Sequence, residues 1–197
     1  CIHNLVILSS FDIFRIAKAL EVSAKKLFEN KILTYRINPT NFWMEPILNS
    51  KANSTCPFLF SKSSGEDNKE YLCEIYEFRP LVCRIYPLKY DKSENLFLRF
   101  LPAENRCWEC ISNEKNPTLT EYLDNANIPN FLGEYTKYLK LIESIQVNLN
   151  LEKIKKNKLA QEKFFKIQAI LYETYPNQNE EKLPFDEMKF RIEEILE

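Results

Sequence analysis

Glycine and histidine are scarce in this sequence, and both scarcities exclude familiar kinds of active site. The two glycines are Gly65 and Gly133, whereas a Walker A loop or a GxGxxG turn needs several glycines close together. The single histidine is His3, so the chain holds neither an HExxH zinc site nor a two-histidine, one-carboxylate iron site. A triad mechanism would have to use His3, and the sequence around it shows no nucleophile elbow.

Excess charge and long apolar runs are missing as well. The formal net charge is −1 at pH 7, so the chain has no overall basic field for nucleic acid, and we expect no nucleic-acid partner. No apolar run approaches the ~20 residues of a membrane span, and we expect no membrane insertion. With 45% hydrophobic and 28% charged residues, the composition is typical of a soluble globular protein.

Cysteine is the informative residue that the sequence does contain. The six cysteines are Cys1, Cys56, Cys73, Cys83, Cys107 and Cys110. An even number allows three disulfides, which would require an oxidising compartment, but 14 Phe and 10 Tyr allow a core without such cross-links. The CWEC turn at 107–110 spaces two thiols suitably for zinc or an iron–sulfur cluster, although CxxC is also a redox motif. We favour metal binding in a cytoplasmic protein, with disulfides and unrelated free thiols as the alternatives.

Hydrophobic periodicity predicts a mainly α fold with irregular cysteine-rich loops and a few short strands. Ser10 and Ser23 are expected to cap two successive helices. Two short strands and then an exposed polar loop are expected at 32–37, 41–48 and 61–70. Residues 71–110 show little periodicity and hold four of the six cysteines, which is typical of a segment that a metal orders.

The second half of the chain is predicted to be helical. The expected ranges are 118–127, 131–149, 151–175 and 185–197. In the third range, the positions expected to be buried are Ile154, Leu159, Phe164, Ile167, Ile170 and Leu171. We therefore expect a metal-organised cysteine region at 1–115 and a helical region at 116–197 that packs on it. Docking of a partner or selection of a substrate is the alternative to a purely structural role for the helical region.

Two stretches of the sequence resemble the signatures of a known family. CEIYEFRPLVCRIYP at 73–87, with CPFLF at 56–60 before it, resembles the second signature of the CxxCxxCC family of zinc- or iron-chelating domains, also called the YkgJ-like cysteine cluster family. VILSSFDIFRIAKAL at 6–20 is similar to the segment that follows the first signature, a CxxCxxCC run. Cys1 is therefore expected to be the last cysteine of such a run, with the others upstream. CWEC is similar to the tail of longer members, so the resemblance covers residues 1 to about 110.

The resemblance implies a metal site with the cysteines as ligands, and two kinds of site remain open. One CxxC plus widely spaced single thiols suits a cluster gathered from several loops, and six thiols with further ones upstream would suffice for one or two [4Fe–4S] clusters. Such a cofactor would serve redox chemistry or the modification of a protein substrate. Some members resemble flagellin lysine methylases, which implies methylation with S-adenosylmethionine. The alternative is a structural zinc module, without turnover, whose helical half binds a protein partner.

Four further residues are candidates for the surroundings of the cofactor. Arg79 and Arg84 are expected to offset the negative charge of the thiolates, either by hydrogen bonds to sulfur or by pairing with Glu77. An ordinary structural ion pair between Glu77 and Arg79 is the alternative. Tyr76 is expected to pack against the cysteine loop, with a chemical role as its alternative.

Overall fold

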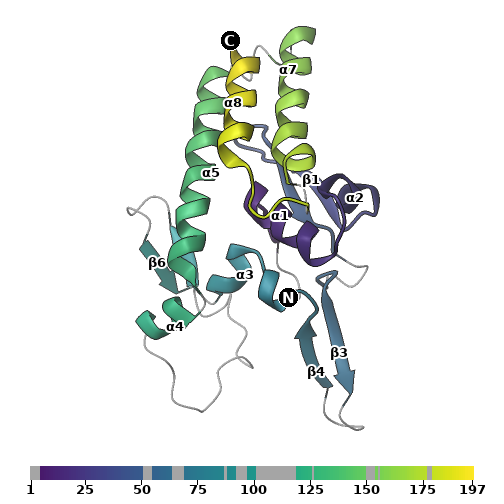
Figure 1. The fold of residues 1–197 in the computed structure, drawn as a ribbon, viewed down its shortest axis with the longest axis vertical. Coiled ribbons are helices and arrows are strands. Elements are labelled where there is room, and N and C mark those ends of the chain that lie inside the picture. The colour runs from purple at the N-terminus through teal and green to yellow at the C-terminus, as the bar shows by residue number, and fades with distance from the viewer. Residues whose placement is uncertain are drawn as a thin grey trace.

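Helices dominate the architecture, with pairs of short antiparallel strands attached to them (Figure 1). The computed structural model describes residues 5–50, 55–63, 69–86, 88–91, 97–100, 119–125, 127–149, 154, 156–176 and 179–197. The predicted mainly α fold class is confirmed. Among the helices of these ranges, none combines the length and the apolar character needed to cross a membrane.

The N-terminal helices α1 (Ser10–Ala19) and α2 (Ala24–Glu29) form where serine caps predict them, with one correction. Ser9, not Ser10, is the N-cap of α1, because Ser9 is extended and its Oγ accepts the Asp12 N–H at 3.2 Å. The Asp12 carboxylate accepts the Ser9 N–H in return at 2.9 Å, which completes a capping box. Ser23 caps α2 as predicted.

The strands in the part of the chain that the structure describes form three antiparallel pairs. The first pair, β1 (Leu33–Ile37) and β2 (Met44–Leu48), lies within the predicted ranges. The second pair is β3 (Leu59–Ser63) and β4 (Lys69–Cys73), so the predicted loop at 61–70 is wrong at both ends. The third pair, β5 (Leu88–Asp91) and β6 (Phe97–Phe100), lies in the segment that shows little periodicity.

The remaining helices connect and then cover these pairs. In chain order they are the 3₁₀ turn η1 (Tyr76–Phe78), α3 (Leu81–Ile85), α4 (Leu119–Asn125), α5 (Ile128–Asn148), α7 (Lys158–Ala169), its π-helical continuation η5 (Ile170–Thr174) and α8 (Phe185–Leu196). Figure 1 shows α5, α7 and α8 side by side at one end of the molecule, with α3 and the β3–β4 pair at the other. Helix α1 lies between them and contacts α2, α5, η1 and η5.

One large core joins the N-terminal elements to the C-terminal helices. Residues without exposed surface in this core come from α1, α2, α5, α7, η5 and α8, among them Ile13, Leu27, Ile145, Ile167, Leu171 and Ile192. Of the positions predicted to be buried in 151–175, Phe164, Ile167 and Leu171 are buried. Leu159 is 62% exposed, so that prediction is wrong; it lies in the first turn of α7. The boundary at residue 115 between a cysteine region and a helical region stays a prediction.

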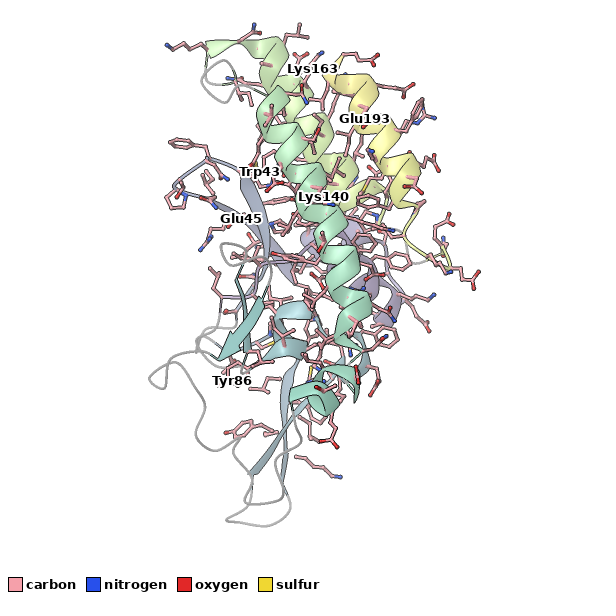
Figure 2. All side chains as sticks on the ribbon, turned by 90° about the vertical axis from the view of Figure 1, so that its left-hand side faces the viewer. Trp43, Glu45, Tyr86, Lys140, Lys163 and Glu193 are labelled. Atoms are coloured by element: carbon pink, nitrogen blue, oxygen red, sulfur yellow. The ribbon has the colours of Figure 1, made fainter. Side chains whose placement is uncertain are left out.

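A buried hydroxyl network crosses this core beside the π-helical segment. Trp43 Nε1 donates to the Tyr172 hydroxyl at 3.1 Å, and the Tyr138 hydroxyl lies 2.7 Å from the same oxygen. Figure 2 shows Trp43 where the β1–β2 pair meets the long helices. Burial raises the pKa of Tyr138 and of Tyr172, so both hydroxyls stay protonated and serve as hydrogen-bonding groups.

Replacing Ile192 with alanine tests whether α8 belongs to the common core. Ile192 has 0% exposure, whereas Phe190 in the same helix is 56% exposed. Ile192→Ala is expected to lower the free energy of unfolding by about 2–5 kcal/mol, because it leaves a cavity. Phe190→Ala is the matched control and should change it by about 0.5 kcal/mol or less. Urea denaturation followed by circular dichroism measures both; equal effects, or a separate transition of the C-terminal helices, would contradict a shared core.

Candidate metal centre

Three free thiols from three separate segments of the chain influence one another electrostatically. Cys56 precedes β3, Cys73 is the last residue of β4, and Cys83 lies in α3. The Cys56 carbonyl accepts the Leu59 N–H at 3.1 Å, and Leu59 is the cross-strand partner of Cys73. The hairpin register therefore brings Cys56 and Cys73 to the same end of the β3–β4 pair. All three side chains are half-buried and pack against the main core.

The electrostatic effects on the thiols show that they share one neighbourhood. Burial, followed by the charges of Cys56, Asp12 and Cys73, raises the pKa of Cys83 to about 12. Burial also raises the pKa of Cys73, and the Ile75 N–H, which hydrogen bonds to it, opposes the rise. Without a cation Cys73 and Cys83 therefore favour the protonated form, and a nearby metal ion would reverse that preference.

The donor chemistry fits a thiophilic metal, but the described residues do not complete a coordination shell. Within the ranges that the structure describes, no three His, Cys, Asp or Glu side chains form a group ready to hold a metal ion. Cys1, Cys107 and Cys110, the other predicted ligands, lie outside the described residues. Soft thiol donors on separate segments suit zinc and iron alike. Of the six predicted ligands, Cys56, Cys73 and Cys83 lie within the described residues.

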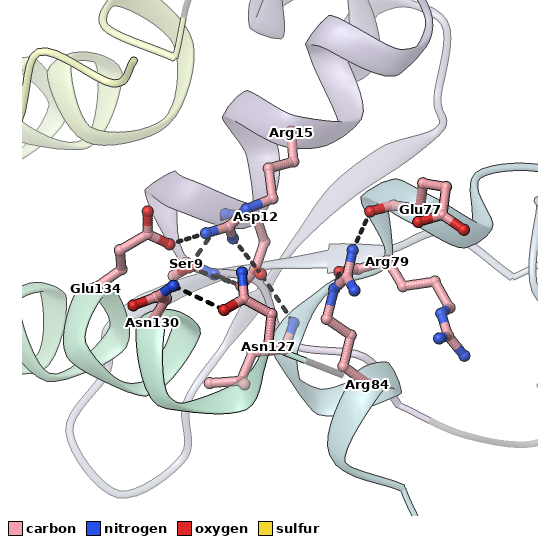
Figure 3. Close-up of polar contacts among 10 residues, drawn as sticks. Ser9, Asp12, Arg15, Glu77, Arg79, Arg84, Asn127, Asn130 and Glu134 are labelled. Atoms are coloured by element: carbon pink, nitrogen blue, oxygen red, sulfur yellow. Dashed lines mark hydrogen bonds and ion pairs between the residues drawn. The ribbon is translucent and has the colours of Figure 1, made fainter. Parts of the chain in front are cut away.

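The turn between Cys73 and Cys83 is held by the predicted arginines. Arg84 is buried, and its Nε donates to the Arg79 carbonyl at 3.0 Å while its Nη2 donates to the Glu77 carbonyl. Figure 3 shows that this second bond reaches the Glu77 backbone rather than its carboxylate. Arg84 thus closes η1 and the start of α3 into one unit.

Arg79 and Tyr76 form the exposed side of the same turn. The Arg79 guanidinium stacks 3.6 Å from the centroid of the Tyr76 ring, and its Nε donates to the Tyr76 carbonyl at 2.9 Å. Its positive charge lowers the pKa of Cys73 against the effect of burial. Arg79 therefore acts on a thiol through charge. A cofactor-binding role for Tyr76, Glu77, Arg79 and Arg84 stays a prediction.

Sequence reasoning missed the carboxylate that connects α1 to α3. Asp12 is 2% exposed, and its Oδ2 accepts the Ser9 N–H at 2.9 Å and the Ser9 hydroxyl at 2.6 Å. Its Oδ1 accepts the Leu81 N–H at 3.0 Å, two residues before Cys83. The S-x-x-D spacing is a local signal for the capping box, but nothing local signals the bond to Leu81.

A second connection missed by sequence reasoning runs through Phe131 of α5. The guanidinium carbons of Arg15 and Arg84 lie 4.0 Å and 4.3 Å from the centroid of the Phe131 ring. Arg15 also pairs with Asp12 at 3.4 Å and with Glu134 (Figure 3). Burial lowers the pKa of Arg15 to about 10, so it remains charged at neutral pH. The ring therefore joins both sequence signatures to the helical half.

These thiols and their supports define the chain as a cysteine-cluster protein. A comparison with family models matches residues 1–107 to the family described as "CxxCxxCC: Putative zinc- or iron-chelating domain". This match covers more than half of the chain, which therefore belongs to that family, as the sequence predicts. No curated protein and no solved structure matches the chain.

The raised pKa of Cys83 predicts slow alkylation of the metal-free, reduced protein. Thiolate is the reactive form, and an unperturbed thiol has a pKa of about 8.5. At pH 8, Cys83 should react with iodoacetamide at least tenfold more slowly in the native state than in urea. Its native rate should still rise about tenfold per pH unit up to pH 10, whereas the rate in urea levels off. Mass spectrometry of the labelled peptides measures both; equal native and unfolded rates would refute the shift.

Proposed function

We propose that this protein binds a [4Fe–4S] cluster through its cysteines and uses it in redox chemistry or in modifying another protein. The observation that carries the proposal is that Cys56, Cys73 and Cys83, three single thiols from separate segments, share one electrostatic neighbourhood. Membership of a family of zinc- or iron-chelating domains supports a metal at this place. Cys1, Cys107 and Cys110 complete the proposed ligand set and allow a second cluster.

The arrangement of the thiols favours a cluster over zinc. Structural zinc sites commonly use CxxC pairs on tight turns, whereas these three thiols stand alone, before a strand, at a strand end and within a helix. Iron–sulfur clusters accept thiolates delivered by several loops. The CxxC of the sequence, Cys107 and Cys110, would add a pair to this scattered set.

The chain's own residues would hold the cofactor, balance its charge and keep water away. The Ile75 N–H and the Arg79 charge both favour the thiolate form of Cys73, and such donors raise the reduction potential of a cluster. Phe58, 4% exposed and two residues after Cys56, belongs to the apolar core against which the three thiols pack. When bound, the cluster supplies the electron-transfer chemistry, and the polypeptide positions it.

A protein is the proposed partner or substrate, and the cytoplasm the proposed location. Aromatic side chains remain exposed on the elements that carry the thiols: Phe60 of β3 is 46% exposed, Tyr71 of β4 59% and Tyr76 of η1 56%. Exposed aromatic surface of this kind is typical of protein-binding sites. The thiols of Cys56, Cys73 and Cys83 are free, and a reducing compartment would keep them available for metal.

Metal analysis of full-length protein purified without oxygen tests the proposal. We expect a brown protein with visible absorption and roughly four iron and four sulfide per cluster. Cys73→Ser should lose most of the iron, because it removes a ligand, whereas Ser61→Ala on the exposed surface of β3 should retain it. Stoichiometric zinc without iron would replace the proposal with the structural zinc module, and absence of both metals would refute either site.

Calorimetric titration with S-adenosylmethionine separates methylation from simple redox chemistry. The sequence offers no glycine-rich nucleotide loop, because Gly65 and Gly133 are far apart. A methylating protein would therefore bind S-adenosylmethionine through the cluster itself or in a pocket of another kind, and we propose the cluster. We expect binding to loaded protein and none to the Cys73→Ser variant. No binding to loaded protein would remove the methylation version and leave redox chemistry.

A further inference from the structure

Asp12 is a buried carboxylate whose two oxygens serve two different helices. It is 2% exposed, and an ionised group at such a depth is costly unless hydrogen bonds satisfy it. Its Oδ2 accepts hydrogen bonds from the Ser9 N–H and the Ser9 hydroxyl, at the start of α1. Its Oδ1 accepts a hydrogen bond from the Leu81 N–H at the start of α3, 69 residues further along the chain. The same oxygen accepts a hydrogen bond from the Arg15 guanidinium. The side chain thus joins two helix starts, as Figure 3 shows for α1.

Helix α3 depends on this bond because it lacks a cap of its own. It has five residues, and its N-cap, Pro80, makes no side-chain hydrogen bond. A helix this short is unstable alone, and its first N–H groups need acceptors from elsewhere. Asp12 provides such an acceptor from α1.

The other supports of α3 hold it to different neighbours. Arg84 bonds the carbonyls of Glu77 and Arg79, which belong to the turn just before the helix. Leu81 and Ile85 pack with Ile128 of α5 in a small apolar cluster. The Asp12 bond to the Leu81 N–H, in contrast, joins α3 to α1.

We infer that Asp12 is a positioning residue for the metal site: through the Leu81 N–H it fixes α3, and with it the Cys83 thiol, beside Cys56 and Cys73. The inference rests on the proposed metal site. The role is geometric, because the contact that reaches α3 is the hydrogen bond from the Leu81 N–H to Asp12 Oδ1. A neutral oxygen in the same place would accept that bond as well.

Cobalt(II) titration of the reduced, cluster-free, full-length protein measures the effect on the site. The thiolate-to-cobalt charge-transfer band reports binding by cysteine sulfur. Asp12→Ala should weaken cobalt binding about tenfold or more, as loss of a group that orients a ligand typically does. Asp12→Asn keeps an oxygen for Leu81 and should bind within about threefold of the wild type by the same reasoning. Ser9→Ala is the matched control: it weakens the α1 cap without touching Leu81, and cobalt binding should be unchanged.

A second pair of variants keeps the test valid if Asp12→Ala does not fold. Asp12→Glu retains the charge but moves the carboxylate by one methylene, whereas Asp12→Asn retains the position and loses the charge. Geometry predicts that the Glu variant binds cobalt more weakly than the Asn variant. The reverse order, or wild-type affinity in Asp12→Ala, would overturn the inference.

Amide hydrogen exchange of the metal-free protein separates this inference from the proposed function. Exchange in a peptide covering Leu81–Ile85 should accelerate at least tenfold in Asp12→Ala, and clearly less in Ser9→Ala, while peptides of α8 stay unchanged. Unchanged exchange at Leu81–Ile85 would refute the anchoring role, whatever the metal content. If the wild type binds neither cobalt nor iron, the proposed metal site fails, and with it the positioning role; exchange then decides whether Asp12 still anchors α3.

Discussion

The carboxylate of Asp12 is the interaction on which the cysteine half of the molecule depends. Its oxygens satisfy the start of α1 through Ser9 and the start of α3 through Leu81. At α1 the carboxylate acts together with the Ser9 hydroxyl, which accepts the Asp12 N–H, whereas at α3 Pro80 provides no side-chain cap. Since a buried charge must be satisfied on every side, the packing of α1 against α3 is specified by hydrogen bonds as well as by apolar contact.

The helical half of the chain takes part in the same construction. The family match ends at residue 107, yet Phe131 lies against Arg15 of one signature and Arg84 of the other. Two cations on one ring gain from its negative faces and from the exclusion of water. The large core also mixes residues from α1, α5, α7 and α8. The C-terminal helices therefore share a core with the N-terminal elements and contact the arginines that lie near the cysteines.

Sequence patterns predicted those features whose cause is local. The Ser23 cap, the β1 strand and helices α5 and α8 follow from periodicity and capping, and the thiols follow from residue type. Periodicity alone did not separate Ser9 from Ser10, although the spacing of Ser9 and Asp12 is a local signal that favours Ser9. The polar residues Ser61 and Lys62 concealed strand β3. Contacts such as that of Asp12 with Leu81 join residues 69 positions apart. Such contacts produce no periodic pattern in the sequence from which they could be predicted. The supports of the site were therefore harder to predict than its candidate ligands.

The two hydrogen bonds from the Arg84 guanidinium to backbone carbonyls bear on how the protein would acquire a metal. These bonds fix the path between Cys73 and Cys83 using protein groups alone. Small zinc domains, in contrast, gain their order from the ion and unfold when it leaves. Here the Arg84 bonds limit the conformational freedom of the turn with groups of the protein itself. The order of this turn therefore has a source other than a metal ion.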